Sequence, residues 1–114
     1  MQRKYRLRAN ADFQRVRRTG QSVANRWFVL VWAPNELDHC RFGFAVGKKL
    51  GGAVERNKIK RRLRTMLRLH LQADQLRSGM DVVIIARHAA RDADYHTLNR
   101  ALNKLLGRAR LWQK

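Results

Sequence analysis

The segment Met80–Ala86 is the feature that most restricts how this chain can fold. Six of its seven residues are apolar, and four of those are β-branched. A strand with one solvated face alternates apolar and polar residues, whereas this run has no polar face. It therefore predicts a central strand that is buried by the rest of the chain.

Two further strands are expected before this segment. Trp27–Ala33 is rich in β-branched and aromatic residues, and Pro34-Asn35 closes it as a turn. In Phe42–Gly47 large and small residues alternate, which predicts one bulky face and one face that another element approaches closely. Because a short connection joins these two strands, we expect them to pair antiparallel.

Three helices complete the pattern. Asn10 is expected to cap a short helix that stops at Gly20. A long helix should follow the basic connector Lys48–Gly52, and a last helix should end at Gly107. The long helix has an apolar stripe at Ile59, Leu63, Met66, Leu67 and Leu71.

The expected order is α-β-β-α-β-α, which indicates an α+β fold of the two-layer α/β sandwich type with a mixed sheet. The third strand is reached through the long helix, so it should be parallel to a neighbour. We expect a single domain over residues 1–114, with a basic N-terminal arm and a basic C-terminal tail.

The charge balance points to a polyanionic partner. Lys and Arg number 26 against 8 Asp and Glu, a formal net charge of +18. Such an excess costs self-repulsion in a compact chain unless an anion offsets it. The single Cys40 excludes an internal disulfide and fits a reducing compartment. No signal peptide or membrane-length apolar run is present, so we expect a cytoplasmic protein with no membrane partner.

The long helix carries the most informative charge pattern. Asn57, Arg61, Arg64 and Arg68 fall together roughly 150° from the apolar stripe when the segment is wound at about 100° per residue. Like charges at this spacing repel, which suggests that phosphate groups lie between them. A solvated basic face and a helix lying on an anionic membrane are the alternatives.

The sequence resembles the protein subunit of bacterial ribonuclease P. The resemblance rests on Phe42–Lys49 followed by Ala53–Arg61, in which Arg56-Asn57-Lys58 stands at the family's "RNR" motif. Asn10–Val16, Ser22–Arg26 and Val82–Arg87 also fit the family, in order and at suitable spacing.

The resemblance implies a left-handed βαβ crossover and a function without catalytic residues in this chain. A large RNA subunit would cleave the 5′ leader from precursor tRNA with Mg²⁺, which the RNA would mainly hold, and no small-molecule substrate is expected. Contacts to the catalytic RNA are expected from Lys48, Lys49, Arg56, Asn57, Lys58, Lys60, Arg61, Arg64 and Arg68. Contacts to the single-stranded leader are expected from Phe13, Arg17, Phe28, Val31 and Arg87.

Two positions depart from the family pattern. Arg17 stands where the family often has a second aromatic residue, and Val31 stands where it often has Tyr. Arg17 can still stack on a base or contact a phosphate. Phe13 also has a structural interpretation, because a Phe three residues after an N-cap is commonly a core residue.

The residue chemistry agrees with a binding role. Two-metal phosphodiester cleavage needs converging carboxylates, but the eight acidic residues are scattered or suit turns and caps. His70 lies on the apolar side of the long helix, which favours packing over catalysis. A ribosomal-type structural RNA-binding protein is the main alternative, and a DNA-binding protein that reads the major groove is another.

Overall fold

The computed structural model describes residues 2–113. Its helices are α1 (Asn10–Thr19), α2 (Ala53–Gln72) and α3 (Tyr95–Arg108), and its strands are β1 (Gln21–Ala24), β2 (Phe28–Pro34), β3 (Arg41–Ala45) and β4 (Met80–Ala86). The 3₁₀ turn η1 (Arg3–Tyr5) precedes α1, and the 3₁₀ turns η2 (Lys48–Leu50) and η3 (His88–Arg91) precede α2 and α3. The expected α+β fold with a mixed sheet is confirmed.

The strand order β1-β2-β4-β3 corrects the expected pairing. We predicted that β2 and β3 pair antiparallel, but β4 lies between them. It is antiparallel to β2 and parallel to β3. The apolar β4 takes an interior position in the sheet, where both of its faces are covered. The short strand β1, antiparallel to β2, was not predicted.

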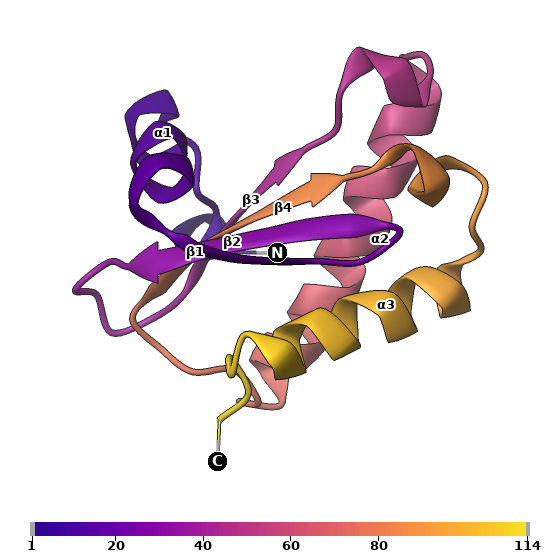
Figure 1. Ribbon diagram of the computed structural model, residues 1–114. Coiled ribbons are helices and arrows are strands. Elements are labelled where there is room, and N and C mark those ends of the chain that lie inside the picture. Colours follow the sequence, from indigo (N-terminus) through magenta and orange to yellow (C-terminus); the bar gives the residue numbers. More distant parts are fainter. Residues whose placement is uncertain (1, 114) are drawn as a thin grey trace.

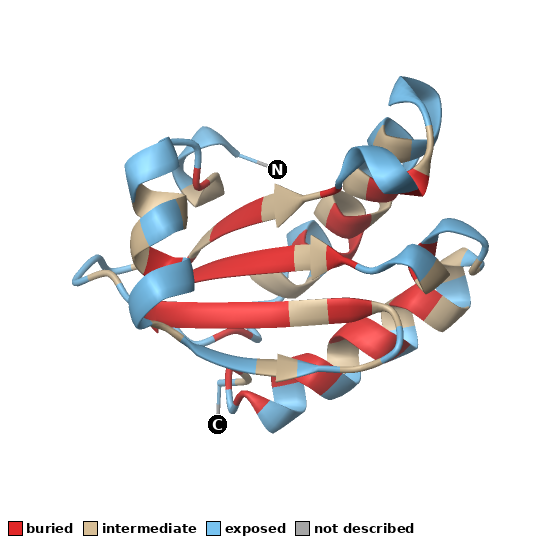
Figure 2. Cartoon of the chain, turned by 45° about the horizontal axis from the view of Figure 1, so that its top comes forward, coloured by how far each residue is buried: buried red, intermediate tan, exposed pale blue. Residues whose placement is uncertain are grey.

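Helices cover both faces of the sheet to different extents. Helices α2 and α3 lie on one face, and α1 lies over part of the other (Figure 1). Both faces of β4 are buried, including Val82 and Ile84 toward α2 and α3 and Val83 toward α1. Figure 2 shows this burial as a red band through the middle of the sheet.

The β3–α2–β4 connection is a crossover between parallel neighbours. In Figure 1 both strands run toward the upper right, β4 lies below β3, and α2 passes behind the sheet. This arrangement is left-handed, as the resemblance implies, and it departs from the usual right-handed rule.

The helix boundaries match the local signals at most ends. Gly20 follows α1, and its backbone N–H donates to the Val16 carbonyl oxygen. Asp94 caps α3, since its side chain accepts a hydrogen bond from the Thr97 backbone N–H. Two predictions were wrong by one residue: Ala9 holds the cap position of α1 in place of Asn10, and α3 continues past Gly107 to Arg108.

Residues near both ends of the described chain pack against the domain. The Leu7 N–H donates to the Phe42 carbonyl oxygen over 2.8 Å, which places the N-terminal arm at the free edge of β3. The expected basic C-terminal tail also carries packing residues, because Leu111 is buried and Trp112 bridges to Leu76. Within the described residues, no helix is long and apolar enough to cross a membrane.

Candidate nucleic-acid interface

Helix α1 is fixed to the sheet by a buried ionic cluster. Asp81 is fully buried at the start of β4, and its carboxylate accepts hydrogen bonds from Arg15 of α1 and from Arg41 of β3. The Asn35 side-chain amide donates to the same carboxylate over 2.9 Å. The hydrogen bond to Asp81 raises the pKa of Arg41 further above its usual range. This cluster sets the position of α1, because it joins one helix and two strands through a single charge.

Phe13 extends from α1 onto the backbone of β3. A Cβ atom added to Gly43 would lie 2.3 Å from the Phe13 Cζ atom, so the ring lies directly against this glycine. The alternation in Phe42–Gly47 predicted such a close approach, and Phe13 is the group that makes it. Phe13 remains half-buried, and its structural and binding interpretations are therefore compatible.

The face of the sheet beyond α1 is apolar and partly open. Val29 of β2 and Ile85 of β4 are half-buried there, and both pack against the small core cluster under α1. Val31 belongs to that same cluster and is only 7% exposed. Together these side chains form an apolar floor beside Phe13.

Phe28 was wrongly assigned to this face. It is fully buried among the core residues that contact α2 and α3. Successive side chains of a strand point to opposite faces, and in β2 the even-numbered residues point away from α1. Arg17 is exposed on α1, and Arg87 is exposed just after β4. The Arg87 guanidinium also donates to the Asn25 carbonyl oxygen over 2.9 Å.

A groove of about 190 Å³ joins this face to the basic helix. Lys60 and Arg64 of α2 line it together with Phe13, Gly43 and Phe44. The Arg64 guanidinium carbon lies 6.0 Å from the centre of the Phe44 ring. The groove therefore brings Phe13, a predicted contact to the leader, next to Lys60 and Arg64, which are predicted contacts to the catalytic RNA.

Two arginines that sequence reasoning missed complete the groove. Arg6 and Arg8 of the N-terminal arm line it as well. Arg6 Nε is buried without a hydrogen-bond partner, which among residues 2–113 is true of no other buried side-chain nitrogen or oxygen. An unpartnered buried donor is costly unless a ligand satisfies it. The charge of the N-terminal arm was visible in the sequence, but its pairing with β3 was not.

The other predicted RNA-subunit contacts lie along the outer surface of α2 and before it. Asn57, Lys58, Arg61 and Arg68 are exposed, and Arg56 is half-buried with its Nε donating to the Gly52 carbonyl oxygen over 3.4 Å. Arg62 instead points inward, because it donates to the Ala93 carbonyl oxygen before α3. The buried stripe holds four of the five predicted residues, Ile59, Leu63, Met66 and Leu67, whereas Leu71 is half-buried.

The connector before α2 is partly ordered as η2 rather than fully irregular. Lys48 and Lys49 are exposed on it, while Leu50 is buried and fixes it to the core. Gly51 has a φ of 126°, a conformation that favours glycine. The two lysines therefore stand next to the first turn of α2.

Cys40 and His70 have structural environments. Burial raises the pKa of the Cys40 thiol. His70 is packed as predicted, with ring nitrogens 2.9 Å from Gln75 Oε1 and 2.9 Å from Asn103 Oδ1. Within the described part of the chain, no three His, Cys, Asp or Glu residues are grouped as metal ligands.

The fold and the groove together define the class of protein: a small, basic α+β protein with a surface suited to binding RNA. The model of the family described as ribonuclease P matches residues 1–110. The chain belongs to the ribonuclease P protein family. It is accordingly a subunit of an endoribonuclease in which RNA carries the catalysis, and it acts in tRNA processing.

Individual relatives agree over nearly the whole length. The ribonuclease P protein component of Staphylococcus carnosus (strain TM300) is 41% identical over 115 residues, covering 100% of this chain and 97% of the relative. The RNase P protein of Staphylococcus aureus, solved at 2.0 Å, superposes with a TM-score of 0.89 at 42% identity, covering 96% of this chain and 98% of that one. The RNase P protein from Thermotoga maritima superposes with a TM-score of 0.82 at 34% identity, covering 90% of this chain and 96% of that one.

Proposed function

We propose that the chain holds the catalytic RNA of ribonuclease P with α2 and the 5′ leader of precursor tRNA with the face beside α1. One observation carries this proposal: Phe13, Lys60 and Arg64 line a single groove. Substrate and catalyst are both polyanions, and a protein of net charge +18 offsets the repulsion between them. We expect this to occur in the cytoplasm.

The catalytic RNA is assigned to α2 and the connector before it. Exposed arginines such as Arg61 grip phosphate oxygens with a planar fork, and Lys48, Lys49 and Lys58 act as point charges. Arg56, Asn57, Lys60, Arg64 and Arg68 complete this proposed surface. Its dominant contacts are to phosphates, so the affinity for the RNA should depend steeply on salt.

The leader is assigned to Phe13, Arg17 and Arg87, with Val29 and Ile85 as the apolar floor. Stacking on an aromatic ring tolerates any base, because every base presents a π-face. This suits a leader whose sequence differs between tRNA precursors. Phe28 is left out because it is buried on the opposite face, and Val31 contributes beneath the surface.

Mg²⁺ is assigned mainly to the RNA subunit. The most buried carboxylate of the described chain, Asp81, already has two arginine partners and an asparagine amide. These contacts occupy the lone pairs that a cation would need, so the residues present do not fit a protein-held Mg²⁺. The protein's effect on the Mg²⁺ requirement would then come from its positive charge.

The direct test is cleavage of precursor tRNA at low Mg²⁺. Three samples are compared: the protein alone, bacterial ribonuclease P RNA alone, and the two together. We expect cleavage only in the mixture, with RNA alone becoming active at high Mg²⁺. Cleavage by the protein alone would overturn the assignment of catalysis to RNA, and a mixture no better than RNA alone would overturn the proposed role.

A further inference from the structure

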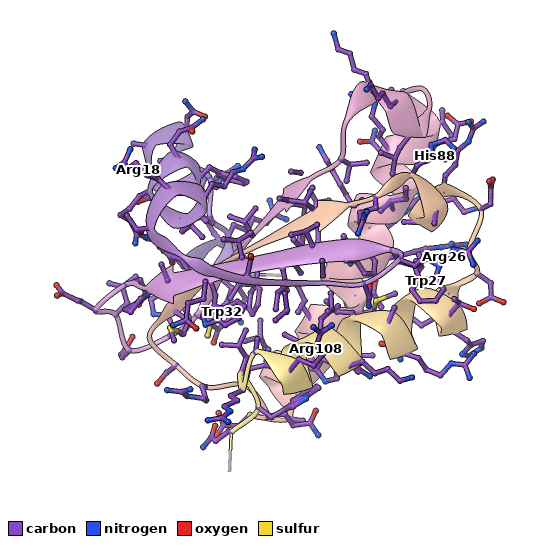
Figure 3. The ribbon with its side chains drawn as sticks, in the orientation of Figure 1. Arg18, Arg26, Trp27, Trp32, His88 and Arg108 are labelled. Carbon is purple, nitrogen blue, oxygen red and sulfur yellow. The ribbon has the colours of Figure 1, made fainter. Side chains whose placement is uncertain are left out.

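A second cationic groove lies along α3, apart from the surfaces described above. Its volume is about 410 Å³, and its apolar floor is made by Trp27, Ala101 and Leu105. Arg100, Lys104 and Arg108 form its rim. Figure 3 shows Arg26 and Trp27 beside the first part of α3 and Arg108 near its C-terminal end, whereas Arg18 lies on α1.

The three rim cations follow one another at four-residue spacing. Residues four apart lie on the same face of a helix, so Arg100, Lys104 and Arg108 form one stripe along α3. All three are exposed, and no acidic residue lines the groove. Like charges at this spacing destabilise an isolated helix, and a bound polyanion would remove that repulsion.

The turn before β2 holds Trp27 in place at this groove. Asn25 Oδ1 accepts hydrogen bonds from the Trp27 and Phe28 backbone N–H groups over 3.0 and 2.9 Å. The Asn25 side-chain amide donates to the Ala101 carbonyl oxygen over 3.1 Å, which ties the turn to α3. Arg108 donates to the Ala24 carbonyl oxygen over 2.9 Å. The backbone that carries the ring is therefore held before any ligand arrives, which lowers the entropy cost of binding.

The Trp27 ring remains partly accessible. It is half-buried, and the exposed Arg26 places its guanidinium carbon 5.9 Å from the ring centre. An aromatic ring beside a row of cations is the arrangement that binds single-stranded nucleic acid, with a base on the ring and phosphates on the cations.

We propose that this groove binds a second single-stranded RNA segment, with a base against Trp27 and phosphates on Arg100 and Lys104. Residues of α3 line the groove, and α3 covers the face of the sheet opposite α1, the helix that carries Phe13 (Figure 1). An acidic peptide would use the cations but leave the ring without a partner. A second copy of this chain is disfavoured, because its net charge of +18 would be repelled.

The test follows Trp27 by nuclear magnetic resonance in the full chain while an eight-residue oligouridine is added. The Trp27→Phe variant assigns the Trp27 indole N–H signal, which separates it from Trp32 and Trp112. We expect this signal to shift and saturate. In Arg100→Ala/Lys104→Ala, the dependence of log affinity on log salt should fall by about 1.4, because each phosphate contact to a single strand contributes about 0.7.

The matched control is Arg61→Ala/Arg64→Ala, which removes two charges from α2. It should leave the Trp27 response to oligouridine unchanged, so failure of the α2 proposal and failure of this one give different results. An unshifted Trp27 signal, or the same response in Arg100→Ala/Lys104→Ala, would overturn the proposal. So would an oligoglutamate of equal charge that shifts Trp27 with equal or higher affinity, because it would assign the groove to an acidic protein.

Discussion

Asp81 and Arg41 form a two-point ion pair at the parallel β3–β4 step. Arg41 Nε lies 2.8 Å from Asp81 Oδ1, and one of its terminal nitrogens lies 2.7 Å from Asp81 Oδ2. Arg15 reaches the same carboxylate from α1. The single acidic residue in the apolar strand is therefore the group that positions α1, and with it Phe13, over the sheet.

Replacing Asp81 should be strongly destabilising. Asp81→Ala leaves Arg15 and Arg41 without their shared anion, and we expect a loss of about 3 kcal/mol in unfolding free energy. This is at the lower end of the range for breaking a buried pair, because both arginine side chains are partly exposed. Urea unfolding measures it. Asp38→Ala, at a fully exposed side chain, is the control and should change stability little.

The proposed α2 surface predicts a change in salt dependence. Arg61→Ala/Arg64→Ala should reduce the slope of log affinity for the catalytic RNA against log salt by about one to two, because each phosphate contact releases about one counterion. Filter binding at several salt concentrations measures the slope. Arg17→Ala/Arg18→Ala removes the same charge from α1 and should leave it unchanged. Equal slopes in the first variant and the parent protein would remove this part of α2 from the interface.

Phe13→Ala should weaken leader-bearing substrate selectively. Loss of one stacked base costs about 1–3 kcal/mol of binding free energy, and leaderless tRNA does not make that contact. Affinities of the holoenzyme for the two RNAs measure the difference. Val16→Ala is the control, since Val16 is fully buried in the same helix and should lower stability without selectivity. Equal losses for both RNAs in Phe13→Ala would make Phe13 a core residue only.

Gly43→Ala should reproduce part of the Phe13 effect. The added Cβ would lie 2.3 Å from the Phe13 ring, so the ring has to move away from β3. We expect a smaller selective loss of leader-bearing substrate than in Phe13→Ala, measured in the same assay. Gly47→Ala is the control, because nothing lies within 4 Å of its added Cβ. A Gly43→Ala protein with full leader selectivity would show that the ring position is unimportant.

The Asp94 cap should make α3 sensitive to acid. Hydrogen bonds from Thr97 hold the pKa of Asp94 below its usual value of 3.8. A lowered folded-state pKa means that the stabilisation is complete above the unfolded-state pKa and is lost as pH falls through the folded-state pKa. The stability difference between the parent protein and Asp94→Ala should therefore be constant above about pH 5 and shrink below 3.8. Urea unfolding at several pH values measures it, and a difference that does not depend on pH would contradict the charged cap.

The sequence alone determined every helix and strand except the short β1, and the kind of partner that the protein needs. The uniform apolar run at Met80–Ala86 required a central strand, and the stripe around Leu63 required a helix packed on a core. Both signals are local, because they depend on the spacing of neighbouring residues. The basic face of α2 and the net charge of +18 indicated a polyanion, and the resemblance identified the family.

Tertiary structure alone decided the order of the strands and which side of each strand faces α1. The position of β4 between β2 and β3 is a long-range pairing that a short connecting loop does not encode. In β2 every residue from Phe28 to Ala33 is apolar, so the sequence does not show which side faces α1. The same holds for the grooves. Arg6 and Lys60 line one groove, and Trp27 and Lys104 line the other, only because separate elements pack on one sheet.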